Sequence, residues 1–274
     1  NFVEKHGSEF ITIKLSLAWA QGEKNPPPRT WPKQLSMIRK FAEYQHARDS
    51  RTEIPLPEHA PRFRKRIEPF IYKDTDIQAL MRAASKHPPK LKGATYSTMI
   101  GLLASTGMRV GETIALDRSD FNSESRLILI RQTKFGKTRQ IPLHQTTVDA
   151  LCTYAKERDR LMPHANTEAF FISNRGKRVF YDTFQSCFHR LVNAIGLQTK
   201  RASGPRIHDL RHSFAINTLV SWYRLGLDVD PKLPALSTYL GHVSPSCTYW
   251  YLSATPELLD QARLRLEKIP GGQS

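Results

Sequence analysis

The sequence predicts a mainly α-helical fold with one small antiparallel β hairpin or sheet, which places it in the α+β class. Apolar residues recur at helical spacing through most of the chain. In residues 31–49 they are Leu35, Ile38, Phe41 and Tyr44. Two strand-like runs at 127–143 flank a tight turn at Phe135-Gly136. Three consecutive prolines within 22–30 end the first helical stretch, because proline cannot continue a helix.

The sequence also predicts two helical units joined by a linker. Residues 51–69, RTEIPLPEHAPRFRKRIEP, are rich in proline and in basic residues. Such a segment either lies extended against phosphates or connects two domains as a solvated chain. We expect a first unit at 1–55, a basic linker at 56–71 and a second unit at 72–274. Because residue 1 is Asn and not Met, we expect the first unit to lack its beginning.

A surplus of positive charge indicates a polyanionic partner. Lys and Arg number 41 against 25 Asp and Glu, which gives a formal net charge of +16. Such a surface attracts either nucleic acid or an anionic membrane, by steering and by counterion release. No segment approaches the roughly 18 apolar residues of a membrane span, and no single basic amphipathic helix dominates the charge. We therefore expect nucleic acid as the partner and no membrane.

The cysteines indicate a reducing compartment. Cys152, Cys187 and Cys247 are odd in number, far apart and without the paired spacing of zinc ligands. This pattern excludes a disulfide framework and a cysteine-based metal site. We therefore expect a cytoplasmic protein.

The first segment with candidate catalytic residues is STGMRVGETIALDRSDF, residues 105–121. Arg109 opens a short predicted helix whose neighbours are largely apolar. An arginine on a partly buried surface needs an anionic partner. Glu112, one turn later, is one such partner and would form an ordinary ion pair.

The second segment is the predicted hairpin. Lys134 stands where the first strand meets the turn, and Lys137 and Arg139 follow beyond it. Taken alone, a lysine at a hairpin tip is a solvated charge.

The third segment is RIHDLRHSFA, residues 206–215. In a helix His208 and Arg211 share a face, because they lie three residues apart. His212 lies four residues after His208, so HDLRH also resembles a zinc-binding HExxH helix. Asp209 replaces the glutamate base of that motif, and no convincing third ligand follows. We therefore expect no metal here.

The last two segments are LGHVS, residues 240–244, and CTYWYLSATPELL, residues 247–259. In the first, a glycine and His242 end a helical run. The second groups Tyr249, Trp250 and Tyr251. An aromatic cluster of this kind is either core packing or part of a site.

The ordered set of these segments resembles the tyrosine recombinase, or phage integrase, family. The order is Arg-x-x-Glu, hairpin Lys, His-x-x-Arg, Gly-His, and then a tyrosine nine residues after that histidine. The resemblance covers residues 72 to about 256. It implies an integrase-like catalytic domain at 72–274. Residues 1–55 resemble, more loosely, the family's helical core-binding domain with its beginning missing.

By this resemblance, Arg109 and Arg211 match the two catalytic arginines, and Glu112 matches the acidic residue beside the first. Lys134 matches the hairpin lysine, because TKFGKTRQIPL follows the family's strand-turn-strand pattern. Lys137 is an alternative, since the length of the turn varies in such hairpins.

His208 and His242 match the family's two histidines. Tyr251 matches the nucleophile, with Tyr249 as an alternative two residues earlier. The spacing from His242 favours Tyr251.

The resemblance implies transfer of a DNA phosphodiester to the tyrosine hydroxyl, with release of a 5′-hydroxyl. Arg109 and Arg211 would stabilise the charge on the phosphate, and His242 would hydrogen-bond it. Lys134 would protonate the leaving oxygen, and His208 would accept a proton or hold the phosphate. The covalent bond conserves the phosphodiester energy, so we expect neither a cofactor nor a metal.

The implied partner is double-stranded DNA, bound by a homo-oligomer with a dimer per site and a tetramer in synapsis. Helper proteins and association with the nucleoid are further expectations. The implied function is integration, transposition or resolution of mobile DNA. Two alternatives are a type IB topoisomerase, which relaxes DNA without a second site, and a DNA-binding regulator that has lost catalysis.

The end of the chain predicts one more helix. Thr255 is a candidate N-cap, Pro256 occupies the first helical position, and Pro270-Gly271 ends the helix. An apolar stripe runs along it at Leu258, Leu259, Ala262, Leu266 and Ile269. This stripe packs either on its own domain or, as the resemblance implies, on a neighbouring protomer.

Overall fold

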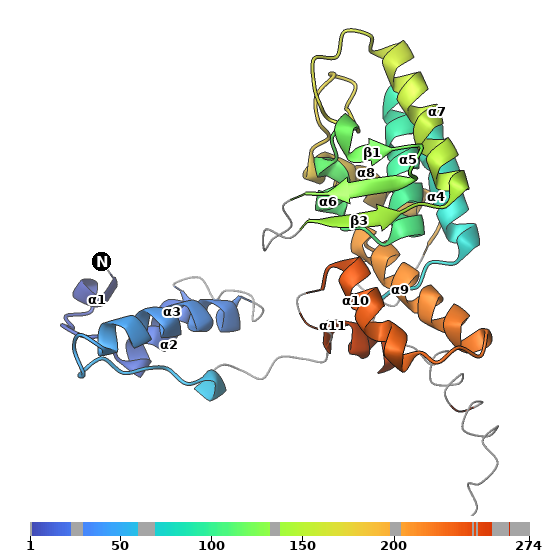
Figure 1. The fold of residues 1–274 in the computed structure, drawn as a ribbon. Coiled ribbons are helices and arrows are strands. Elements are labelled where there is room, and N and C mark those ends of the chain that lie inside the picture. The colour runs from blue at the N-terminus through green and yellow to red at the C-terminus, as the bar shows by residue number, and fades with distance from the viewer. Residues whose placement is uncertain are drawn as a thin grey trace, which may run out of the picture. The chain divides into compact units, whose positions relative to one another are not determined.

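The protein is described by a computed structural model, in which helices predominate (Figure 1). The described residues are 2–22, 30–59, 69–131, 138–197, 204–242, 244, 246–253 and 263. The predicted class, mainly α with a small antiparallel sheet, is confirmed. No helix in these ranges is long and apolar enough to cross a membrane.

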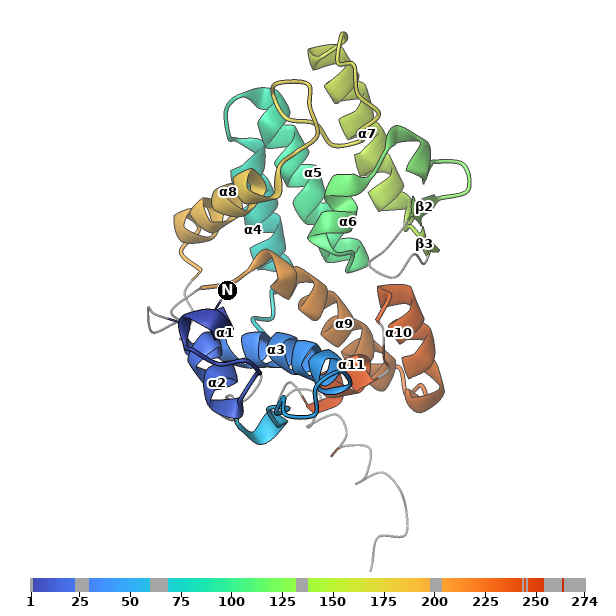
Figure 2. The ribbon, with the colours of Figure 1, turned by 90° about the vertical axis from the view of Figure 1, so that its left-hand side faces the viewer.

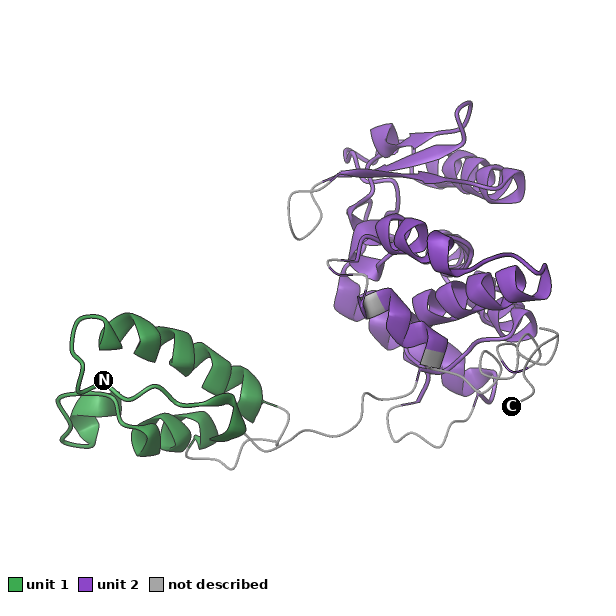
Figure 3. Ribbon diagram, turned by 60° about the horizontal axis from the view of Figure 1, so that its bottom comes forward, with its two compact units in different colours: residues 1–67 green, residues 68–274 purple. Residues whose placement is uncertain are grey.

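The chain forms two compact units, Asn1–Ile67 and Glu68–Ser274 (Figure 3). The division falls within residues 56–71, where we expect the linker. Most of that segment, like the proline-rich loop at 23–29, lies outside the described residues.

The first unit is helical throughout its described part. Its elements are α1 (Phe2–Lys5), α2 (Ile13–Gln21), α3 (Trp31–His46) and the 3-10 turn η1 (Pro57–His59). Pro32 lies in the first turn of α3, where its missing N–H costs no hydrogen bond. Leu35 and Ala42 of α3 are buried, whereas Phe41 is 48% exposed and Tyr44 is 52% exposed. The apolar stripe that the sequence shows here therefore faces the core over only part of its length.

The second unit is built around one central helix, α5 (Lys90–Thr106), which contacts α4 (Asp74–Ser85), α7 (Gln145–Leu161) and α9 (Ile207–Arg224). Apolar side chains along one broad face of α5 are buried, whereas the opposite face lines a surface groove. They include Leu91, Tyr96, Met99, Ile100, Leu102 and Leu103. α8 (Tyr181–Ala194) contacts α4, so the core of this unit consists of packed helices (Figure 2).

Within the described ranges, the sheet has three antiparallel strands in the order β1 (Phe121–Asn122), β2 (Leu127–Ile130) and β3 (Arg139–Pro142). The register pairs Ile128 with Ile141 and Ile130 with Arg139. Ile128, Ile130 and Ile141 are buried, as the strand-like pattern predicts. The predicted turn at Phe135-Gly136 lies outside the described residues.

The described part of the second unit also contains several short helical elements. They are α6 (Val110–Ala115), η2 (Arg118–Asp120), η3 (Asp230–Lys232), α10 (Leu233–Leu240), α11 (Ser246–Tyr249) and η4 (Trp250–Ser253). Among the described residues, a second hydrophobic cluster lies under this part of the unit. It joins the later half of α9 to α10 and includes the ring of Tyr251, which is only 2% exposed. The candidate nucleophile is therefore anchored in the core.

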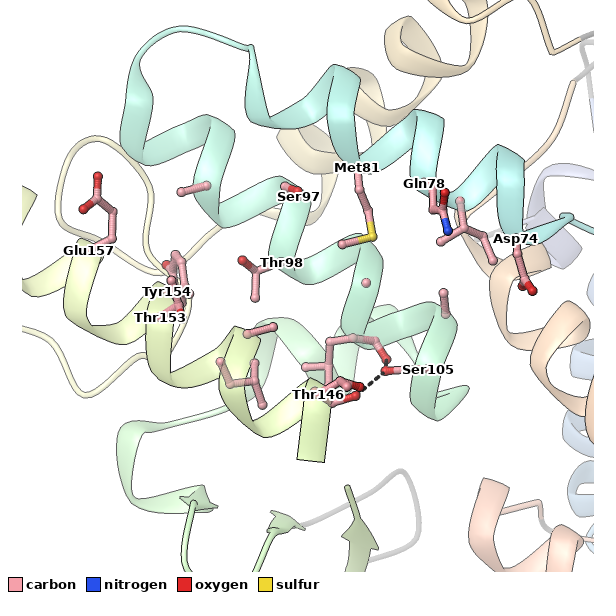
Figure 4. Close-up of a pocket in the computed structure, with 18 residues that line it drawn as sticks. Asp74, Gln78, Met81, Ser97, Thr98, Ser105, Thr146, Thr153, Tyr154 and Glu157 are labelled. Atoms are coloured by element: carbon pink, nitrogen blue, oxygen red, sulfur yellow. Dashed lines mark hydrogen bonds between the residues drawn. The ribbon is translucent and has the colours of Figure 1, made fainter. Parts of the chain in front are cut away.

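A surface groove of 820 Å³ runs along α4, α5 and α7 (Figure 4). Small and hydroxyl-bearing side chains such as Ser97 and Thr98 line it, with Asp74 and Glu157 among them. No predicted site residue of the described part of the chain lines this groove. The predicted site residues of the described part lie instead at the start of α6, in α9 and after α10.

Candidate active site

Arg211 is a buried cation held by the ends of two helices. It lies in the second turn of α9 and is 3% exposed. Its Nη1 donates to the carbonyl of Gly107 at 2.8 Å, and its Nη2 donates to the carbonyl of Leu240 at 2.5 Å. These carbonyls end α5 and α10, where no helical N–H is left to bind them and the helix dipole is negative. Two helix C-termini thus solvate a charge that water cannot reach.

Arg109 approaches the same place from the start of α6. Its Nη1 lies 2.9 Å from Oε1 of Glu112, and its Nη2 donates to the carbonyl of Gly241 at 2.6 Å. The side chain is 36% exposed, so part of the guanidinium still faces outward. The ion pair that the sequence predicts is therefore present, and it orients Arg109 without covering it.

Arg139, the first residue of β3, completes the network. Its Nη1 and Nη2 donate to the two carboxylate oxygens of Glu112 at 2.9 and 2.7 Å, and its Nε donates to the carbonyl of Tyr239 at 3.0 Å. The sequence reasoning named Arg139 only as a hairpin cation and missed this role. A signal was available, because Arg139 lies on the same face of β3 as buried Ile141, where an arginine requires an acidic partner.

The charges of this network favour a bound anion. Burial alone would raise the pKa of Glu112, but hydrogen bonds from Arg139 and Arg109 hold it below its usual value, so the carboxylate is ionised. Burial, and then the charge of Arg109, lower the pKa of Arg211 to about 10, so it remains a cation at neutral pH. Among the described side chains here, three guanidinium groups thus face one carboxylate. A phosphate would balance the excess charge.

The two histidines of α9 lie beside this cluster with their rings edge to face, 4.7 Å apart. Desolvation, and then the charges of Arg211 and Arg206, lower the pKa of His208 to about 4, although part of its ring reaches the surface. Desolvation, and then the neighbouring His208, lower the pKa of His212 to about 3. Both rings are therefore neutral at physiological pH.

Tyr251 packs into the site through its aromatic neighbours. Its ring centroid lies 5.6 Å from that of His212, 5.3 Å from that of Trp250 and 6.2 Å from that of His242. Its hydroxyl oxygen lies 2.9 Å from Nδ1 of His212. Tyr249, by contrast, is 48% exposed. The structure thus brings Tyr251 to the histidines and leaves the alternative tyrosine at the surface.

His242 follows the left-handed Gly241 that ends α10. Its backbone N–H donates to the carbonyl of Ser237 at 2.9 Å, and its Nδ1 lies 2.7 Å from Oγ1 of the buried Thr248. These two contacts fix the ring beside Tyr251.

Six of the seven predicted site residues are described, and they come together from separate segments. Arg109 and Glu112 come from α6 and its cap, His208 and Arg211 from α9, and His242 and Tyr251 from the segments after α10. Lys134 and the alternative Lys137 lie outside the described residues. Among the side chains that the structure describes, no group of three or more His, Cys, Asp or Glu could hold a metal ion.

Residues 71–257 match the family model described as the phage integrase family. The protein named integrase/recombinase y4rB of Sinorhizobium fredii is 40% identical, over 97% of this chain and 87% of its own length. Tyrosine recombinase XerC of Pelotomaculum thermopropionicum is 29% identical, over 84% of this chain and 72% of its own length.

Solved structures give the same fold. The XerH recombinase bound to a palindromic difH substrate has a TM-score of 0.73 at 18% identity, over 97% of this chain and 76% of that one. A lambda integrase dimer bound to a core site has a TM-score of 0.59 at 20% identity, over 88% and 64%.

The fold and the site are those of an integrase-type domain. Its arginines, histidines and tyrosine follow the motif order of the phage integrase family. The chain belongs to the phage integrase family.

Gly241→Ala tests the packing of the arginine network. At φ +65° an alanine is strained, and its Cβ would lie 2.9 Å from Nη1 and 3.1 Å from Cζ of Arg139, whose guanidinium is bound on several sides. Gly226→Ala is the matched control, because it has φ +70° and nothing within 4 Å of the added Cβ. Both variants should lose about 1–2 kcal/mol from the backbone strain. We expect Gly241→Ala alone to lose more stability and DNA cleavage, measured by urea unfolding and single-turnover cleavage. Equal behaviour of the two variants would contradict a role for this close contact.

The lowered pKa of His212 predicts a pH-dependent stability. In the unfolded chain the histidine titrates near pH 6.5, whereas in the folded protein its pKa is about 3. Below pH 6.5 the unfolded state therefore binds more protons, and stability is lost as the pH falls from about 6.5 toward 4. We expect His212→Asn to flatten this fall in the unfolding temperature. His164→Asn, at an exposed loop position, should keep the wild-type slope. A His212→Asn slope that equals the wild-type slope would contradict the buried neutral ring.

Proposed function

We propose that this chain, a tyrosine-type site-specific recombinase, breaks and rejoins DNA strands through a 3′-phosphotyrosine bond made by Tyr251. One observation carries the proposal. Tyr251 lies buried against His212 and His242. Arg211 donates to the carbonyls that end α5 and α10, and Arg109 donates to the carbonyl of Gly241 beside them. A phenol and two fixed guanidinium groups are the parts that metal-free phosphoryl transfer to tyrosine needs.

The arginines would bind the non-bridging oxygens of the scissile phosphate. Each guanidinium is fixed by carbonyls or by Glu112 before the substrate arrives, so little reorganisation is needed as charge develops. Arginine suits this role because its planar fork donates in pairs and stays charged. His242 would add a hydrogen bond to the phosphate from beside the nucleophile.

The reaction begins with attack by the Tyr251 oxygen on phosphorus and release of a 5′-hydroxyl. Because Tyr251 is 2% exposed, we propose that its surroundings open before DNA reaches this oxygen. Cleavage is thereby tied to binding of the substrate. The leaving oxygen needs a proton, for which we propose Lys134 on the hairpin that ends in β3. Attack by another 5′-hydroxyl on the phosphotyrosine reverses the chemistry and completes strand exchange.

We propose double-stranded DNA as the partner, bound by a homo-oligomer with a dimer per site and a tetramer in synapsis. The net charge of +16 suits a long polyanion. The similar solved structures include recombinases bound to DNA, and one of them is a dimer on its site. The separate unit at Asn1–Ile67 would act as the core-binding domain, joined by the basic linker at 56–71 to a catalytic domain at 72–274.

Recombination is favoured over the two alternatives considered from the sequence. The relatives are named as integrases and recombinases, and the matched family is the phage integrase family. The set of arginines, histidines and tyrosine also argues against a regulator without catalysis, since DNA binding alone does not require a buried nucleophile.

Replacement of the nucleophile tests the central step. Tyr251→Phe should keep the affinity for DNA and abolish the covalent adduct, because only the hydroxyl oxygen forms the bond. The measurement is trapping on a suicide substrate nicked beside the cut site, followed by denaturing electrophoresis. Tyr249→Phe is the matched control and should still form the adduct. The reverse pattern would move the nucleophile to Tyr249, and adducts in both single variants would overturn the assignment.

The leaving-group step shows which of the two lysines, Lys134 or Lys137, is the general acid. Lys134→Ala should slow cleavage of ordinary DNA by about 10²–10⁴-fold, the range of a missing general acid. The same variant should cleave a substrate with a bridging 5′-sulfur at the wild-type rate, because a thiolate leaves without a proton. Lys137→Ala is the control and should behave alike on both substrates. Rescue by sulfur in Lys137→Ala instead would identify Lys137 as the acid.

A further inference from the structure

One contact of the candidate nucleophile has no role in the proposed binding of the phosphate or release of the 5′-oxygen. The hydroxyl oxygen of Tyr251 lies 2.9 Å from Nδ1 of His212, within ordinary hydrogen-bond distance. His212 follows Arg211 directly on α9, so the residue that contacts the phenol adjoins the residue that would hold the phosphate. The backbone of one helix therefore fixes both groups.

The reaction requires an acceptor for the phenolic proton. A phenol with a pKa of about 10 is a poor nucleophile at neutral pH while it keeps its proton. His208, which the family resemblance offers for this step, packs edge to face with His212 and is an exposed residue. His212 is the histidine whose nitrogen lies against the reacting oxygen.

We propose that His212 is the general base that takes the phenolic proton of Tyr251. In the neutral tautomer with its proton on Nε2, Nδ1 accepts the hydrogen bond of the phenol. As the bond from the phenolic oxygen to phosphorus forms, the proton moves to Nδ1. The bond from phosphorus to the 5′-oxygen breaks, and that oxygen takes its proton from the general acid. On rejoining, the imidazolium returns the proton to the departing Tyr251 oxygen. The inference rests on the proposed function.

The surroundings of His212 suit this role. Its ring packs against Trp250 at 5.8 Å and against His208 at 4.7 Å, so its orientation is fixed. The charged groups that face it are Arg206, Asp209 and Arg211. Desolvation, His208 and the two arginines lower the pKa of His212 against the opposing charge of Asp209, so the ring is neutral above pH 4 and has one nitrogen without a proton. A bound DNA phosphate would add negative charge and stabilise the imidazolium as it forms.

The test compares His212→Ala and His212→Asn in the full chain, by single-turnover cleavage of the nicked suicide substrate. Asn can keep a hydrogen bond near the position of Nδ1 but cannot take up the proton. Each variant is also made with a fluorinated tyrosine at position 251, whose more acidic phenol needs less help from a base. Trp250→Phe is the packing control, because it changes a neighbour of both rings without removing a base.

We expect both His212 variants to cleave about 10²–10⁴-fold more slowly than wild type at neutral pH. The fluorinated tyrosine, or a pH near that of phenol ionisation, should restore most of this loss. Trp250→Phe should lose less activity, and the fluorinated tyrosine should not restore it.

Three results would overturn the proposal while an adduct at Tyr251 still supports the recombinase function. A near wild-type rate in His212→Asn would mean that the contact only positions the phenol. Faster cleavage in His212→Ala would mean that His212 holds the nucleophile in a resting position. A loss that the fluorinated tyrosine does not restore would mean that His212 only packs. An adduct that persists in Tyr251→Phe would instead overturn the proposed function itself.

Discussion

The site depends on the burial of one positive charge. Arg211 is 3% exposed, and a bare guanidinium at that depth would cost several kcal/mol without partners. Its partners are the carbonyls of Gly107 and Leu240, at the ends of α5 and α10. Three helices must therefore meet at one point for the charge to be tolerated. Because α5 is also the central core helix, the packing of the whole second unit determines where this charge lies.

Around this point the protein collects more positive than negative charge. Glu112 receives hydrogen bonds from both Arg109 and Arg139, and so ties α6 to β3. Arg139 also reaches the carbonyl of Tyr239 in α10, which links the hairpin strand to the same helix that binds Arg211. A movement of the hairpin would therefore change the hydrogen bonds that position Arg109 and Arg211. The guanidinium groups are held by several hydrogen bonds and outnumber the carboxylate, which suits a site for a phosphate diester.

The candidate nucleophile combines two roles that usually conflict. The ring of Tyr251 belongs to the hydrophobic cluster between α9 and α10, whereas its hydroxyl contacts the imidazole of His212. Core packing fixes the ring, and the residue as a whole is only 2% exposed. The proposed cleavage therefore includes a step in which DNA binding opens the surroundings of this tyrosine. This connection between packing and reactivity follows from the position of η4 against α9.

The sequence by itself determined the class of fold, the order of the chemical segments and the family, because helical periodicity and motif spacing are local properties. It also predicted Arg109, Glu112 and Arg211 as site residues, and the structure brings these three side chains together. Only the tertiary structure decided that Arg139 belongs to the same network and that His212, rather than His208, contacts the phenol of Tyr251. Contacts such as that of Arg109 with Gly241 join residues 132 positions apart, and no local pattern encodes which helix ends meet. The choice between Lys134 and Lys137 and the placement of the last helix stay predictions, since both lie outside the described residues.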